Sequence, residues 1–239
     1  MLKLTQEKLM ININEYNSTF KAEFENSEIC KQLKNDFSQL SWENHYTFPA
    51  TPRQLCGDPT TKMSMVPFYY LNYLLDKNPK EIYDLGCGWN IFKKYIPNII
   101  GVGAEDPNSP DFFGDIHDVV DDEFIAGHQN YFESVFAINS LHFISLDLLS
   151  NRVSDFVSMI RPGGRGFLTL NLIKMLERTA PDYLITTFQT QKPTKKDADN
   201  YVRIELGKLN FNWLVFDVTV FEKLDDGMDG NIRLVIERN

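Results

Sequence analysis

The sequence has no apolar run long enough to cross a bilayer. A membrane span needs roughly 18 to 20 consecutive apolar residues, whereas the hydrophobic residues of this chain, 43% of the total, are interrupted by polar ones throughout. The first ten residues, MLKLTQEKLM, also lack the apolar core of a secretory signal. We therefore expect a cytoplasmic protein with no membrane partner.

Cysteine is scarce, and metal-ligand spacing is missing. The three cysteines, Cys30, Cys56 and Cys87, are odd in number and form no CxxC pair. Reduced thiols are the default for such a pattern. His117 and His128 have no partner at metal-ligand spacing. We expect neither disulfides nor a metal site.

Positive charge is in deficit. The chain carries 24 basic and 33 acidic residues, a formal net charge of −9. Such a surface repels a polyanion unless basic residues gather on one face. The one compact basic cluster, KPTKK at 192–196, is more typical of a solvated loop. A nucleic acid is therefore a poor partner for this protein.

The chain divides into two parts on its pattern. Residues 1–50 are rich in Lys, Glu, Asn and Gln with apolar residues at mixed helical spacing, which predicts two or three helices. Residues 46–61 hold three prolines and a glycine, so they are predicted to be an irregular linker or flap. We expect a helical N-terminal extension over 1–60 and a second domain over 61–239.

The second domain alternates short apolar runs with helical stretches, which is typical of successive βαβ units and a parallel sheet. Five parallel strands are predicted, at 81–86, 98–104, 111–118, 133–141 and 164–172. Two β-rich runs, 212–224 and 231–239, then flank DDGMDG, whose Asp and Gly residues suit a hairpin turn. The pattern predicts an α/β domain with a seven-stranded, mostly parallel sheet, helices on both faces and an antiparallel C-terminal hairpin.

The strongest local signal is IYDLGCGWN at 82–90. An apolar strand ends in Asp84, and Gly86 and Gly88 allow a sharp turn that approaches a ligand closely. Free N–H groups and the dipole of the following helix would favour an anionic group there. A simple tight turn between strand and helix has the same pattern, so this motif is weak when taken alone.

Two acids follow the next strand at an informative distance. Glu105 and Asp106 lie 19 and 20 residues beyond Gly86. At about this spacing a carboxylate can accept hydrogen bonds from ribose hydroxyls. Two solvated loop acids would fit the pattern equally well.

The fourth predicted strand ends in AINSLHFIS. Asn139 and His142 would therefore lie at the carboxyl edge of the sheet, where open α/β sheets bind ligands. His142 has a side chain suited to general-base chemistry near neutral pH. A packed or solvated histidine on the following helix is the simpler interpretation, so no catalytic residue is assigned.

Four motifs together resemble a known family. DLGCG, GDIHD, NSLHF and RPGGRGFLTL, in this order and at these separations, are similar to motifs of the Rossmann-like class I S-adenosylmethionine (SAM)-dependent methyltransferases. The resemblance covers roughly residues 65–239. In that family a parallel sheet closes with an antiparallel hairpin, which the nicotinamide-binding version of the fold lacks.

The resemblance implies SAM as cofactor and a set of binding residues. Asp84, Gly86, Cys87 and Gly88 would line the methionyl end. Glu105 or Asp106 would hold the ribose, Asp115 and Ile116 would meet the adenine, and Asn139 would lie beside the sulfonium. The acceptor would be a small molecule, a sugar or a protein group.

Two positions depart from the family pattern. Asn90 stands where a third glycine is common, and Gly103 stands where the family's acid usually follows the second strand. These departures motivate an alternative hypothesis, a methyltransferase-like domain that has lost catalysis and serves in binding or regulation. A nicotinamide-dependent oxidoreductase is a weaker alternative, since the predicted hairpin and the lack of a Tyr-x-x-x-Lys pair disfavour it.

Overall fold

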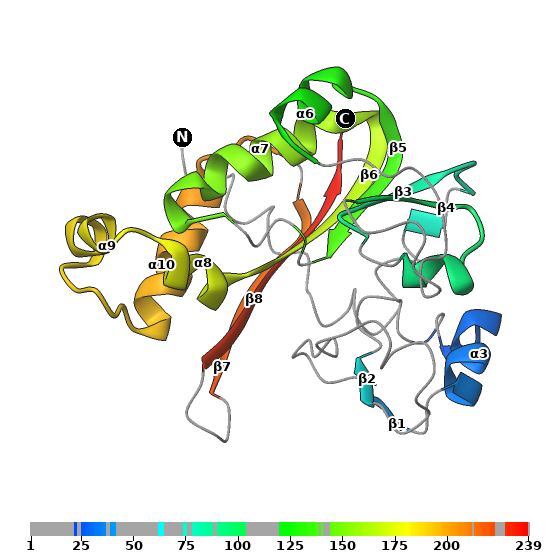
Figure 1. Ribbon diagram of the computed structural model, residues 1–239, viewed down its shortest axis with the longest axis horizontal. Helices are drawn as coiled ribbons and strands as arrows, with labels where there is room; N and C mark the ends of the chain where they lie inside the picture. The colour runs from blue at the N-terminus through cyan, green and yellow to red at the C-terminus, as the bar shows by residue number, and fades with distance from the viewer. Residues whose placement is uncertain are drawn as a thin grey trace.

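The computed structural model describes residues 22, 25–36, 39–41, 62–64, 74–75, 78–87, 90–103, 120–138, 140, 144–211, 213–222 and 228–238. Within them lies a mixed six-stranded sheet of order β4-β3-β5-β6-β8-β7. Helices pack beside it, so the α/β class predicted from the sequence is confirmed (Figure 1).

Four strands of this sheet are parallel. They are β3 (Ile82–Leu85), β4 (Ile99–Val102), β5 (Phe132–Ile138) and β6 (Ile160–Asn171). Because β3 is flanked by β4 on one side and by β5 on the other, the chain reverses its direction of winding there. Ligands of open α/β sheets bind at such a switch point, beyond the carboxyl ends of the strands.

The predicted C-terminal hairpin is present. Strands β7 (Trp213–Glu222) and β8 (Met228–Glu237) pair antiparallel, and β8 also pairs antiparallel with β6 from Arg165↔Glu237 to Asn171↔Asn231. The last strand in the sequence therefore lies between β6 and β7. This arrangement is the closing hairpin that the methyltransferase resemblance implies.

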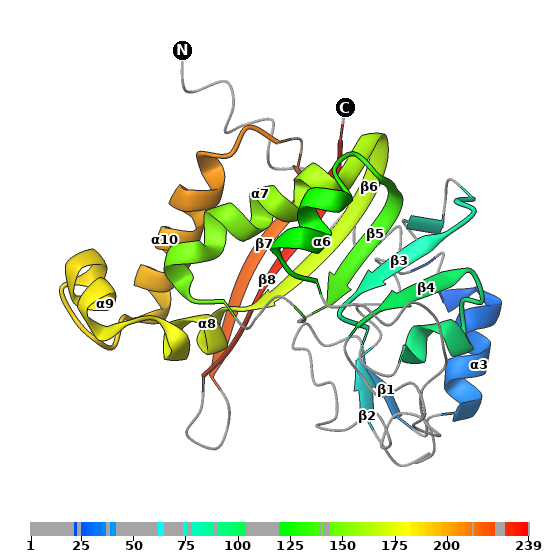
Figure 2. The same cartoon turned by 45° about the horizontal axis from the view of Figure 1, so that its top comes forward.

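Alternate residues of the strands face two different layers. Val135 and Ala137 of β5, with Leu168 and Leu170 of β6, join a large apolar core. Opposite them in that core are residues of α6 (Asp122–Gly127), α7 (Leu149–Met159) and α10 (Lys195–Gly207). These three helices lie on the same side of the sheet in both views (Figures 1 and 2).

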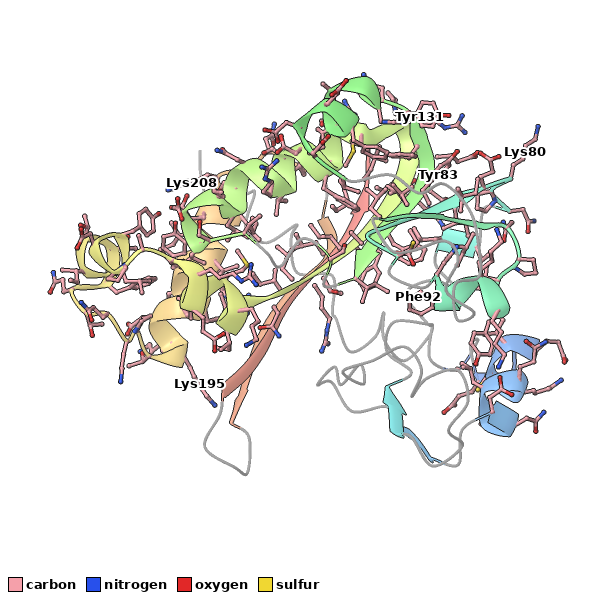
Figure 3. All side chains as sticks on the ribbon, viewed as in Figure 1. Lys80, Tyr83, Phe92, Tyr131, Lys195 and Lys208 are labelled. Atoms are coloured by element: carbon pink, nitrogen blue, oxygen red, sulfur yellow. The ribbon has the colours of Figure 1, made fainter. Side chains whose placement is uncertain are left out.

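The other face of the sheet is also apolar near its middle. Phe136 and Phe167 are fully buried and paired in register. Phe92 contacts Phe136 edge to face, with ring centroids 5.6 Å apart. Phe92 belongs to a short 3₁₀ helix, η1 (Ile91–Lys94), which links β3 to β4 (Figure 3). The helix that was expected to follow the glycine turn is thus a short 3₁₀ helix.

The RPGG segment that was predicted to precede the fifth strand is a bulge within β6. Phe132 pairs with Ile160 and Ser134 pairs with Arg165, so four residues of β6 lie opposite the single residue Glu133 of β5. Gly163 has a φ of +75° in this bulge, a conformation that costs glycine little. The bulge explains why β6 begins before the predicted start of the strand.

The N-terminal extension is only partly helical among the described residues. It contains α3 (Glu28–Asp36), as expected, and also a strand that was not predicted, β1 (Gln39–Ser41), which pairs parallel with β2 (Lys62–Ser64) of the predicted second domain. The predicted linker at 46–61 and the predicted third strand at 111–118 lie outside the described residues. The domain boundary at residue 60 and the seventh strand stay predictions.

Three helices fill the stretch between β6 and β7, which the sequence pattern left without structure. They are α8 (Leu172–Arg178), α9 (Pro181–Phe188) and α10. Thr194 caps α10 in a reciprocal capping box with Asp197. A second short 3₁₀ helix, η3 (Leu146–Leu148), precedes α7 and is joined to α8 where Thr179 Oγ1 accepts from the Leu146 N–H at 2.8 Å.

Arg238 ties the final strand to the end of α7. Its guanidinium donates to the carbonyls of Val157, Ser158 and Ile160, at 2.9 Å for Ser158. The last carbonyls of a helix have no partner within that helix, and a cation near them is favoured by the helix dipole. One side chain thereby satisfies several carbonyls and fixes β8 against α7.

We predict that Arg238→Leu lowers the free energy of unfolding by about 2 kcal/mol, because carbonyls at the end of α7 lose a charged donor. Urea unfolding followed by circular dichroism measures this change. The matched control is Arg203→Leu, which removes an exposed pair with Asp199 on α10 and should cost no more than about 0.5 kcal/mol. Equal losses in the two variants would contradict this role for Arg238.

Candidate functional site

The glycine turn after β3 is bonded to the neighbouring strand. The N–H groups of Gly86 and Cys87 both donate to the carbonyl of Val102, at 2.6 and 3.1 Å. The parallel ladder between β3 and β4 thus continues beyond the end of β3. These two N–H groups are not free for an anionic ligand, contrary to our expectation, and the 3₁₀ helix that follows is too short to supply a strong dipole.

Gly86 touches the end of β5. Its φ is +74°, and a Cβ built on it would lie 2.2 Å from the Cβ of Ser140. The Ser140 hydroxyl donates to the Leu85 carbonyl at 2.6 Å. Glycine is therefore needed at position 86 both for its backbone conformation and for this close approach, which joins the carboxyl ends of β3 and β5.

Asn90 fits the position where the family usually has glycine. It is fully buried with a φ of +53°, and asparagine is among the few residues that tolerate this left-handed conformation. A Cβ on Gly101 would lie 2.5 Å from Asn90 Nδ2 and 2.7 Å from Cys87 Sγ. The side chains of Asn90 and Cys87 therefore pack directly over Gly101 of β4.

Asp84 is a carboxyl group in an apolar setting. It is 3% exposed and paired in register with Gly101 and Phe136. Burial alone raises the pKa of Asp84 well above its usual value, and no hydrogen bond or charge of the described residues counteracts this shift. A buried carboxyl group without a compensating partner, at the end of a strand beside a glycine turn, is a candidate binding group.

The N-terminal extension contacts the segment that follows this turn. Asp36 of α3 accepts a hydrogen bond from Tyr95 Oη at 3.0 Å and pairs with Lys94 Nζ at 2.8 Å. The Lys94 hydrogen bond is the main cause that lowers the pKa of Asp36. Helix α3 is thus attached to η1, close to the glycine turn.

Among the predicted site residues, the structure brings together Asp84, Gly86 and Cys87. The others lie outside the described residues, together with the candidate base His142: Gly88, Glu105, Asp106, Asp115, Ile116 and Asn139. Sequence reasoning missed Ser140, although it stands within the quoted NSLHF motif. A small polar residue there carries no signal until Gly86 is known to lie against it.

Neither a metal-binding cluster nor a membrane span is found among the described residues. They contain no group of three or more His, Cys, Asp or Glu side chains that could hold a metal ion. Among the same residues, no helix combines the length and apolar character that a membrane span requires.

No protein-family model and no curated protein sequence matches the chain. Many solved structures that match it are SAM-dependent methyltransferases. One from Archaeoglobus fulgidus is 16% identical, covers 70% of this chain and 89% of its own, and has a TM-score of 0.42. One from Methanosarcina mazei is 13% identical. The match covers 70% of this chain and 96% of that chain, with a TM-score of 0.43. One from Anabaena variabilis is 15% identical. The match covers 73% of this chain and 83% of that chain, with a TM-score of 0.42.

We predict that Gly86→Ala destabilises the protein more than Gly163→Ala does. Both glycines have a φ near +75°, but a Cβ at Gly163 meets no atom within 4 Å, whereas one at Gly86 collides with Ser140. Gly163→Ala should cost about 1 kcal/mol from backbone strain alone. Gly86→Ala should cost about 1 to 3 kcal/mol more from overpacking. Urea unfolding measures both, and equal losses would show that the Ser140 contact relaxes freely.

We predict that Asp84→Asn stabilises the protein increasingly as the pH rises. The native state holds the Asp84 proton above the pH at which the unfolded chain releases it, so the free energy of unfolding falls with pH between the unfolded and native pKa values. The variant lacks this loss, which is about 1.4 kcal/mol for each unit by which the pKa is raised.

Urea titrations of Asp84→Asn at pH 4 and pH 8 test this prediction. Asp182→Asn, on the exposed start of α9, is the matched control and should show no comparable gain between the two pH values. A constant difference between Asp84→Asn and the unchanged protein at both pH values would contradict the prediction.

Proposed function

We propose that this chain is a SAM-dependent methyltransferase that acts on a small-molecule, sugar or protein acceptor. The observation that carries the proposal is the sheet order, in which a parallel β4-β3-β5-β6 core closes with an antiparallel hairpin whose last strand, β8, lies next to β6. The glycine turn lies at the switch point of this sheet, where such folds bind their ligands.

The described residues fit a cationic, amine-bearing cofactor. Asp84 is a buried carboxyl group that no described donor compensates, and an ammonium group would supply the missing partner. Binding such a group would lower the pKa of Asp84 again, because a nearby positive charge favours the ionised form. Asp84 would hold the ammonium of the methionyl end beside the turn at Gly86 and Cys87.

The distribution of charge favours SAM over a nicotinamide dinucleotide. Residues 95–151 contain ten Asp or Glu and no Lys or Arg, and the predicted ribose and adenine residues belong to this stretch. A surface of this sign attracts the positive sulfonium and repels a pyrophosphate. The remaining residues of the proposed site are those that the resemblance implies: Gly88, Glu105 or Asp106, Asp115, Ile116 and Asn139.

Methyl transfer demands little acid-base chemistry from the protein. SAM supplies a methyl group on a positively charged sulfur, which is already activated for displacement. The work of the chain is therefore to position the acceptor in line with that methyl group and to exclude water. The Ser140 bond to Leu85 would support this positioning, because it holds the residue after Asn139, which the resemblance places beside the sulfonium, against the glycine turn.

A second candidate is a methyltransferase-like protein that binds without catalysis. It is motivated by Gly103, which follows β4 where the family usually has its acid. Asn90 no longer distinguishes the two candidates, because it adopts the left-handed backbone that a glycine would otherwise provide. A localisation in the cytoplasm remains part of the proposal.

We predict that isothermal titration calorimetry detects binding of SAM and of its demethylated product, S-adenosylhomocysteine. Asp84→Asn should weaken binding by about tenfold to a hundredfold, because the ammonium group loses a charged hydrogen-bond partner. Glu81→Gln, an exposed change just before β3, is the control and should leave the affinity unchanged. NAD should not compete with SAM.

No heat of binding at millimolar SAM would rule out the enzyme. Methyl transfer to an acceptor panel is measured with SAM that carries a labelled methyl group. Binding of SAM without transfer to any member of the panel would favour the binding protein. Displacement of SAM by NAD would instead favour the nicotinamide alternative.

A further inference from the structure

The face formed by α6 and α7 carries a groove that the proposed methyl transfer does not use. The groove encloses about 690 Å³. One wall is formed by α6 and the turn after it, with residues at positions 122, 125, 126 and 129. The other is formed by η3 and α7, with residues at 148, 151, 152, 154 and 155. Spacings of three and four residues keep the helical residues of each wall on a single face. The two helices lie side by side in both views (Figures 1 and 2).

The groove combines apolar surface with carboxylates. Ile125 and Ala126 contribute apolar surface from α6, and Leu148 does so from η3 while remaining 37% exposed. Asp122 and Asp155 stand on opposite walls. One exposed leucine is ordinary on a protein surface, but here it lies in a groove that also holds two carboxylates.

Among the described residues that line the groove, Arg152 is the only cation, and it is paired on both sides. Arg152 Nη1 lies 2.7 Å from Asp122 Oδ1 and 3.2 Å from Asp155 Oδ2. Around this pair of carboxylates, Asp121, Glu123 and Asp147 are exposed as well. Asp121 is explained locally, because it caps α6 by accepting from the Phe124 N–H.

The groove lies in an acidic part of the sequence. Asp122, Leu148 and Asn151 of its walls belong to the 57-residue stretch from 95 to 151, which holds ten acids and no Lys or Arg. An excess of acidic side chains attracts cationic partners and repels anionic ones. Arg152 is the first cation after this stretch, and it occupies the position between two carboxylates that a partner's cation would otherwise take.

We propose that the groove between α6 and α7 binds a short basic polypeptide segment, with one aliphatic side chain against Leu148 and Ile125 and Lys or Arg side chains beside Asp122 and Asp155. Each wall spans about two helical turns, or about 10 Å, which matches about three extended residues. The partner is therefore a short linear motif bound weakly, since so small an area is typical of transient contacts. The groove does not depend on SAM binding.

Fluorescence anisotropy with a dye-labelled peptide of core sequence Lys-Leu-Lys tests the proposal. Peptides with cores Lys-Ser-Lys and Glu-Leu-Glu are the matched probes. We expect Lys-Leu-Lys to bind, Lys-Ser-Lys to bind about fivefold more weakly because the aliphatic contact is lost, and Glu-Leu-Glu not to bind.

Variants localise the binding to the groove. Leu148→Ser should weaken Lys-Leu-Lys binding about fivefold, whereas Ile204→Ser, at an isoleucine of α10 that is 60% exposed, should not. Asp122→Asn should weaken it, whereas Asp182→Asn, the same change in the first turn of another short helix, should have little effect.

The sharpest expectation concerns Arg152. Arg152→Gln frees two carboxylates in the groove and should tighten Lys-Leu-Lys binding several-fold, whereas Arg203→Gln removes the same charge from α10 and should not. Thermal unfolding of every variant verifies that it is folded.

Three outcomes would overturn the proposal. They are absence of Lys-Leu-Lys binding to the unchanged protein, equal effects of the groove variants and their controls, and stronger binding of Glu-Leu-Glu. Self-association that Leu148→Ser abolishes, without any peptide binding, would assign the groove to a second copy of the chain and also overturn it.

Discussion

The contact between Gly86 and Ser140 is the constraint on which the candidate site depends. A parallel strand can end in many ways, but here the ends of β3 and β5 approach so closely that no side chain fits between them at position 86. The Ser140 hydroxyl adds a hydrogen bond to the carbonyl that precedes this glycine. The close contact and the hydrogen bond together hold the two strand ends against each other at the switch point of the sheet.

Asp84 and Asn90 show how the residues around that contact share different tasks. Asn90 adopts a left-handed conformation and fills space over Gly101, so its role is to complete the packing of the turn. Asp84 instead lowers the stability of the protein, because its carboxyl group is buried without a partner that would compensate the loss of water. Groups that are unfavourable in the empty protein concentrate at functional sites. Asn90 therefore has a packing role in the turn, whereas Asp84 has a chemical one.

Much of the sheet could be predicted because hydrophobic runs and turn residues act locally. Strands β3, β4 and β5 match predicted runs to within a few residues at each end, and the Asp and Gly residues of DDGMDG indicated the hairpin of β7 and β8. The pair β1 and β2 could not be found this way, since each strand is three residues long and its partner is more than 20 residues away. The helices α9 and α10 were missed although Pro181 at the start of one and Thr194 with Asp197 at the start of the other are local signals.

The glycine turn was predicted at the right place but with the wrong hydrogen bonds. Its N–H groups belong to the ladder between β3 and β4, a relation between two strands that no local pattern encodes.

The position of strand β8 has a consequence for how the protein is made. It is synthesised after β7 yet lies between β6 and β7, so on the ribosome β6 keeps an unpaired edge until residues 228–237 have emerged. During that interval the nascent chain has an open sheet edge, the kind of edge through which unfinished chains associate.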